Sequence, residues 1–130
     1  MKNLLILVSC LVLLSLFQCR KKEACCNIRA NQFKAKFEIK GMCHNYTFSI
    51  IEGNRTDLVE SKWTDPETKK TYTNAFGMTN PCELPENLKE GDEFYGEITA
   101  GSMGTCGTCA AFYPTPDKKI SFRVLKIVEK

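Results

Sequence analysis

The chain has 130 residues, of which 25% are charged, and its formal net charge is +3. Its basic side chains are spread along the chain, whereas a nucleic-acid-binding surface needs clustered positive charge. We therefore expect no nucleic-acid partner. The length leaves room for one folded domain and not for two.

The first 18 residues are typical of a secretion signal. Lys2 supplies the short positive start, and the stretch from Leu4 to Phe17 is almost entirely apolar. This run is shorter than the roughly 20 residues that a membrane-spanning helix needs. We therefore predict export, and not a permanent transmembrane helix.

The apolar run ends at Leu16-Phe17-Gln18-Cys19, which resembles the cleavage box of bacterial lipoproteins. The resemblance implies that Cys19 is the first mature residue and carries a lipid that anchors the protein to a bacterial membrane, with the outer membrane as the expected one. The alternative is ordinary cleavage near Cys19 or Ala24, which gives a secreted protein. The predicted organisation is a signal at 1–18, a lipidated, cysteine-bearing tether at 19–32 and a β domain at 33–130.

Eight cysteines occur in the chain. Cys10 leaves with the signal and Cys19 takes the lipid, so an even set remains. Its members are Cys25, Cys26, Cys43, Cys82, Cys106 and Cys109. In an exported chain such a set predicts three disulfides.

Six cysteines allow 15 connectivities. Cys25 and Cys26 are adjacent, and neighbouring Cα atoms lie about 3.8 Å apart, which is below the usual minimum of ~4.4 Å for a disulfide. The two are therefore expected to bond different partners.

Two strands are predicted at the start of the domain. From Phe33 to Lys40 apolar and charged residues alternate without a fault, which indicates a half-buried strand. Residues 45–51 alternate in the same way, with Tyr46 and Phe48 on one face. Antiparallel pairing of these two strands is the simplest arrangement.

The middle of the chain is more polar. We expect a long connection over 52–70, docked to the domain by Trp63, and then a strand over 72–78. The stretch from Leu84 to Gly91 predicts one short helical turn that ends at the glycine.

Two further strands are predicted near the end. Residues 93–99 alternate around Gly96, which favours a bend or bulge there. Residues 100–117 form a loop, and 118–128 alternate until the phase changes between Val124 and Leu125, which indicates a bulge or a strand covered on both faces. Five strands with one helical turn and no βαβ pattern predict an all-β domain, a small five-stranded barrel stapled by disulfides.

The residues of this region also resemble a known group. Asn80, Leu84-Pro85, Leu88-Lys89, Gly91 and Phe94, followed by a cysteine loop and an Ile/Val-rich closing strand, resemble the small, mostly uncharacterised lipoproteins of gram-negative bacteria. Many of those adopt OB-like barrels, so the resemblance implies an OB-like fold over roughly Phe33 to Val128. It defines no active site.

A second resemblance is to netrin-like and metalloproteinase-inhibitor domains, which are also disulfide-stitched OB barrels. In those domains the amino-terminal cysteine region can inhibit proteases. The resemblance therefore implies a protease-inhibitor-type module as an alternative function, although Cys25-Cys26 stands here where those domains have Cys-x-Cys.

Cys106-Gly107-Thr108-Cys109 has the spacing of a thiol–disulfide exchange site. No helix pattern follows it, so we interpret it as a structural bridge that clamps the loop, with thiol–disulfide exchange as the enzymatic alternative. Zinc binding by Cys43, His44, Cys106 and Cys109 is less favoured, because adjacent Cys43 and His44 make a poor chelating pair. We therefore predict no metal site.

His44 is the only histidine, and no set of nucleophile, base and orienting acid can be assembled around it. We expect it to be a surface turn residue, and we predict neither catalysis nor a cofactor. Aromatic residues make up 10% of the chain, and a possible binding face consists of Tyr72, Phe76, Tyr95, Phe112 and Tyr113. The sequence thus predicts a non-catalytic binding or envelope-accessory module, whose partner besides the membrane is an unknown ligand or protein.

Overall fold

The computed structural model describes residues 28–101 and 109–129. The predicted signal and lipid attachment at Cys19 lie outside the described residues, as do Cys25, Cys26 and Cys106.

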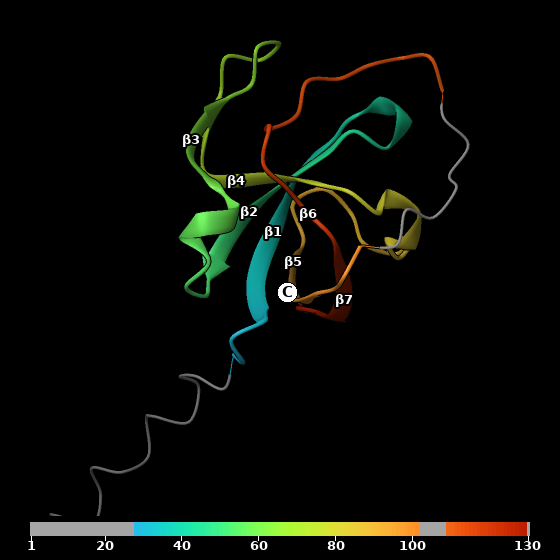
Figure 1. Cartoon of the computed structure of the whole chain (residues 1–130). Coiled ribbons are helices and arrows are strands. Elements are labelled where there is room, and N and C mark those ends of the chain that lie inside the picture. Colours follow the sequence, from blue (N-terminus) through green and yellow to red (C-terminus); the bar gives the residue numbers. More distant parts are fainter. Residues whose placement is uncertain (1–27, 102–108, 130) are drawn as a thin grey trace, which may run out of the picture.

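The described residues form one seven-stranded sheet (Figure 1). Its strands are β1 (Gln32–Lys40), β2 (Tyr46–Glu52), β3 (Glu60–Thr64), β4 (Thr71–Met78), β5 (Glu93–Ile98), β6 (Lys119–Ile120) and β7 (Phe122–Ile127). Neighbours follow the order β3-β4-β2-β1-β5-β7, and β6 pairs with β4. Every pairing is antiparallel except that of β6 with β4, which is parallel. The predicted all-β class is confirmed.

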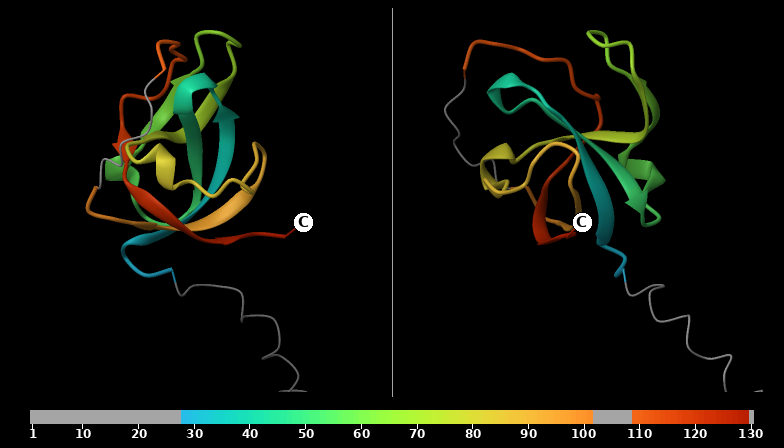
Figure 2. Two further views of the ribbon diagram at one scale, coloured as in Figure 1. Left: turned by 90° about the vertical axis from the view of Figure 1, so that its right-hand side faces the viewer. Right: turned by 180° about the vertical axis from the view of Figure 1, so that it is seen from behind.

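The sheet is strongly curved, as the views in Figure 2 show, but β3 and β7 at its two ends do not pair with each other. The predicted five-stranded barrel is therefore not confirmed. Within the two described ranges no helix is long and apolar enough to cross a membrane.

Phenylalanine dominates the main core inside the curved sheet. Six phenylalanine side chains are fully buried there: Phe33, Phe37, Phe48, Phe76, Phe94 and Phe122. The ring of Phe33 lies edge-on to those of Phe122 and Phe76, with centroids 5.5 and 5.8 Å away, which is the geometry that aromatic quadrupoles favour. The alternation in β1 places Phe33 and Phe37 in this core, because every second residue of a strand faces the same side.

Gly96 lets Phe33 cross β5. A Cβ atom at position 96 would lie 2.7 Å from Cζ of the Phe33 ring, so a side chain there would displace the ring. Beside Gly96 the pairing of β5 with β7 shifts between Tyr95 and Gly96, and Leu125 is left without an opposite residue. The irregularity predicted at Gly96 and Leu125 is therefore confirmed as a bulge.

Two predicted features of the middle segment are wrong. The connection over 52–70 contains a short 3-10 turn, η2 (Thr56–Leu58), and the strand β3. β3 lies at the edge of the sheet and pairs only with β4, so it needs one apolar side chain, Trp63, and lacks the alternation of an inner strand. Trp63 does dock this segment, by packing against a second, smaller cluster of buried side chains.

The helical turn predicted over 84–91 is also wrong. The turn in this region is a 3-10 turn at η3 (Pro81–Glu83), and Leu84 is already extended, with φ −72° and ψ 128°. Pro85 explains the difference, because a proline disfavours helical backbone in the residue before it. Gly91 does adopt a positive φ of 89°.

Asn80 joins the end of β4 to the start of β7. Its side chain is buried, its Nδ2 donates to the carbonyl oxygen of Phe122 at 2.9 Å, and its Oδ1 accepts from the Phe122 N–H at 3.1 Å. The amide thus satisfies two backbone groups in the way that a neighbouring strand would.

We predict that Asn80→Ala lowers the free energy of unfolding by about 3 kcal/mol, because it leaves two buried backbone groups unpaired. Denaturant unfolding measures the loss. Asn87→Ala, at an exposed asparagine in the same connection, is the control and should change stability by less than about 0.5 kcal/mol. Equal effects of the two substitutions would contradict the anchoring role of Asn80.

Candidate functional site

Residues 109–118, here called the strap, pass over the space between two hairpin tips. One tip joins β1 to β2, and the other joins β3 to β4; Figure 1 shows the strap (orange) running above the first tip and beside the second, and Figure 2 shows it from two further sides. The strap is fixed to each tip by a different interaction. Together the three segments form one rim of the domain.

A disulfide fixes the strap to the first hairpin. Cys109 is bonded to Cys43, with Cα atoms 5.5 Å apart and a separation of 66 positions in sequence. Cys43 lies in the 3-10 turn η1 (Met42–His44), where Cys43 and His44 have positive φ values of 58° and 64°. The side chain of Asn45 supports this strained turn by donating to the carbonyl oxygen of Met42 at 2.8 Å.

Gly41 allows the strap to approach the first tip. A Cβ atom at position 41 would overlap the carbonyl oxygen of Asn45 and would come within 3.0 Å of Cβ of Tyr113. The first hairpin therefore needs glycine here for two reasons, its own turn and the contact with the strap.

Tyr113 fixes the strap to the second hairpin. Its hydroxyl donates to Oδ2 of Asp65 at 2.9 Å. Asp65 is fully buried and also accepts from the Thr68 hydroxyl at 2.6 Å and from the Glu67 N–H at 3.0 Å. The carboxylate thus closes its own turn and binds the strap.

These contacts shift both pKa values. Burial alone would raise the pKa of Asp65, but the hydrogen bonds from Thr68, Glu67 and Tyr113 outweigh it and hold the pKa below its ordinary value. The hydrogen bond to Asp65 together with burial raises the pKa of Tyr113 to about 12. Both shifts favour the same state, a charged carboxylate facing a neutral phenol.

A small apolar cluster lies beneath the strap. Ile39, Tyr72 and Ala75 are buried in it, and Trp63 and Tyr113 pack against it. The rings of Trp63 and Tyr72 lie 6.0 Å apart, and Nζ of Lys70 lies 4.7 Å from the centroid of the Tyr72 ring.

The predicted aromatic binding face is divided by the fold. Tyr72 and Tyr113 come together in the small cluster, whereas Phe76 lies in the main core. Tyr95 is half-buried on β5, and Phe112 stands 76% exposed on the strap. The five residues are therefore not brought together on one face.

A groove lies on the outer side of the sheet, next to the small cluster. We call it the outer groove; it is lined by Lys36 and Glu38 of β1, by Ser49, Ile50 and Ile51 of β2, and by residues 70–74. Its cavity volume is about 470 Å³, which lies within the roughly 300–1,000 Å³ of ligand pockets. Lys36 and Glu38 form an ion pair of 3.4 Å at its side.

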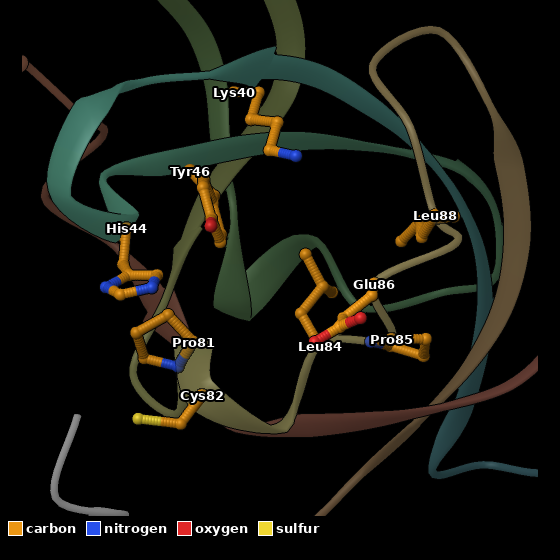
Figure 3. A pocket seen from close by; sticks show the side chains of 9 residues that line it. All are labelled: Lys40, His44, Tyr46, Pro81, Cys82, Leu84, Pro85, Glu86 and Leu88. Atoms are coloured by element: carbon orange, nitrogen blue, oxygen red, sulfur yellow. The ribbon is translucent and has the colours of Figure 1, made fainter.

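A second hollow lies under the first hairpin. Figure 3 shows Lys40, His44 and Tyr46 of the hairpin facing the connection that begins at Pro81 and includes Leu88. Burial raises the pKa of Tyr46 in its wall. The cavity volume of about 250 Å³ is below the usual range for ligand pockets, so of these two hollows the outer groove is the better candidate.

The cysteines confirm the disulfide-stapled character of the domain but not the predicted loop bridge. Cys109 bonds Cys43 and not Cys106, so the Cys-x-x-Cys motif is not closed on itself. Cys82 is also disulfide-bonded. Two of the four zinc ligands that the sequence offers, Cys43 and Cys109, are thereby used as a disulfide, and His44 is an exposed turn residue as predicted.

The sequence did not single out Asp65 or Ser49. The dipeptide Asp65-Pro66 is typical of a turn, and Thr68 three residues after Asp65 is the signal that the Asp65 side chain would close that turn. Ser49 lies between Phe48 and Ile50 at a position that should face solvent, and no local signal shows that it is buried in the fold.

Comparison of the chain with protein-family models, with curated proteins and with solved structures yields no match.

We predict that replacing both Cys43 and Cys109 by alanine lowers the free energy of unfolding by about 4 kcal/mol, because the bridge closes a long loop in the unfolded chain. Denaturant unfolding of the oxidised proteins measures the difference. A loss below about 1 kcal/mol would show that the bridge restrains little, since disulfides typically contribute ~2–4 kcal/mol.

The raised pKa of Tyr113 predicts an alkaline limit to stability. Because the pKa of Tyr113 is higher in the folded than in the unfolded chain, the protonated hydroxyl stabilises the fold fully below the ordinary pKa of 10.0. This stabilisation is lost as the pH rises through about 12. The free energy of unfolding should therefore fall between these values, and Tyr113→Phe should remove that part of the fall. Tyr95→Phe, which leaves the strap intact, should keep it. An unchanged alkaline profile in Tyr113→Phe would contradict the contact with Asp65.

Proposed function

We propose that this protein is an exported, lipid-anchored lipoprotein of the bacterial cell envelope whose OB-like domain binds a ligand or protein and carries out no catalysis. The observation that carries the proposal is the bond between Cys43 and Cys109. It indicates an oxidising compartment, and it holds together two loops of the domain.

An OB-like description of the sheet accounts for its pairings. β1 pairs with β2, β2 with β4, and β4 with β6, while β7 pairs with β5 and β5 with β1. Only Ser121 separates β6 from β7. If β6 and β7 are one interrupted strand and β3 is an added edge strand, five strands remain, as in the partly open barrel of the OB fold.

In this description the disulfide lies at the usual place of OB ligand binding. The loop of residues 41–45 joins the first two strands, and 99–118 joins the last two. Ligands of OB barrels contact these two loops and the face of the second and third strands. That face corresponds here to β2 and β4, which line the outer groove.

The start of β1 and this rim lie at opposite ends of the described domain. The blue segment that leads into β1 lies below the sheet in Figure 1, whereas the strap and both hairpin tips lie at the top. A lipid on Cys19 would hold the rim away from its own membrane, so the rim would face ligands in the surrounding space.

We expect the purified native protein to begin at Cys19, to carry lipid mass, and to expose six alkylatable thiols only after reduction. Intact mass measurement before and after reduction and alkylation tests all three. Cys19→Ala should lose the lipid mass, and Cys10→Ala, within the predicted signal, should keep it. A mature protein that starts near Ala24 without lipid would overturn the anchor and leave a secreted protein.

A further inference from the structure

We propose that the outer groove binds an extended polypeptide strand, which pairs with the edges of β2 and β4 that diverge there. The inference rests on the proposed binding function and gives its ligand class. Strand addition of this kind draws its affinity from main-chain hydrogen bonds and its specificity from alternate side chains.

The groove lies in a fork between two strands. β2 and β4 pair over 47–49 and 75–77, and the pairing ends at Ser49 and Ala75. Both strands continue beyond this point, β2 to Glu52 and β4 back to Thr71. Figure 1 shows them diverging toward the left.

Asn74 opens the fork. It has a positive φ of 51°, a conformation that asparagine tolerates better than most residues. The kink turns residues 71–73 away from β2 and toward β3, with which they pair. Among the described strands, none pairs with 50–52 or 71–73 on the sides that face each other. Unpaired strand edges of this kind are templates for another chain.

Ser49 marks the apex of the fork. Its side chain is only 8% exposed, and its hydroxyl has no hydrogen-bond partner among the described residues. A buried hydroxyl without a partner has lost the hydrogen bonds to water that it makes in the unfolded chain, and this loss destabilises the fold. Because Ser49 lines the outer groove, rotation of its side chain about the Cα–Cβ bond would bring the buried hydroxyl to a backbone carbonyl or amide of a bound strand.

The side chains of the groove favour a peptide over ligands held by ring stacking. The Tyr72 ring is buried, with Lys70 over it and Trp63 beside it, so it presents no open face to a base or a sugar. Ile51, by contrast, is 45% exposed on the lip of the groove and offers an apolar contact to an alternate side chain.

Charge complementarity selects an acidic peptide. The groove contains two lysines, Lys36 and Lys70, against one carboxylate, Glu38. Lys36 is paired with Glu38, which leaves an excess of positive charge at the Lys70 end. A bound strand with an acidic side chain near Lys70 would balance it.

Random peptides displayed on phage, selected against the mature protein with its disulfides intact, test the inference. We expect enrichment of acidic peptides that slow amide hydrogen exchange at 50–52 and 71–74 when bound. Ile51→Glu should weaken the enriched peptides by about tenfold or more. Leu125→Glu, at an equally exposed leucine on β7, is the matched control and should leave the dissociation constant unchanged.

The two buried hydroxyls provide a second pair of variants. Ser49→Ala should weaken binding roughly three- to tenfold through the lost hydrogen bond. Thr47→Val removes the other unpartnered buried hydroxyl, which does not line the groove, and should leave affinity unchanged.

Four outcomes would overturn the inference: no enrichment over a surface without protein, equal binding by Ile51→Glu, protection of amides outside the fork, or binding of arrayed saccharides in the groove with no peptide bound. Peptide binding at another face would contradict the assignment of the outer groove as the binding site, but it would agree with the proposed binding function. The lipid and export part is tested separately by the mass measurement.

Discussion

The bond between Cys43 and Cys109 is the constraint on which the arrangement of the rim depends. It brings together two segments that are 66 residues apart in the chain. Tyr113 follows Cys109 by four residues, so the bridge sets where its ring can lie. The ring then fits against Gly41 and reaches the buried carboxylate of Asp65, and both hairpin tips become parts of one surface.

β4 is the strand that connects this rim to the core. Beyond Asn74 it contributes Phe76 and Met78 to the phenylalanine core, and before Asn74 it contributes Tyr72 to the small cluster. A regular strand would keep positions 72, 76 and 78 on one face. The left-handed residue breaks that alternation, so one strand serves the core at one end and opens the groove at the other.

Strand alternation predicted the inner strands well, because a strand with one buried face must alternate. β1, β2 and β5 lie where their patterns indicate, and the phase change at Leu125 corresponds to a real bulge. β3 carries no such alternation because an edge strand buries little, and the turn predicted over 84–91 is wrong because Pro85 disfavours helical backbone at Leu84.

The candidate site is harder to predict from the sequence than the strands, because its parts are distant from one another in the chain. The aromatic binding face predicted from composition included Tyr72 and Tyr113, which do come together, but it also included Phe76 and Phe112, which lie elsewhere. A list of residue types carries no information on which side of a strand each residue faces. Asp65 and Ser49 acquire their roles from contacts with the strap and with the β4 segment, and neither contact has a local signature.

The Cys43–Cys109 bond also limits how the remaining cysteines can pair with one another. If the other four form two further bridges, and adjacent Cys25 and Cys26 cannot bond each other, only two connectivities are left. In one, Cys82 bonds Cys25 and Cys106 bonds Cys26; in the other the partners are exchanged. Both attach the tether to the domain at two points. A bond between Cys82 and Cys106 would instead leave Cys25 and Cys26 as thiols. The number of thiols that can be alkylated before reduction, none or two, therefore distinguishes a tether stitched to the domain from one that is free to extend.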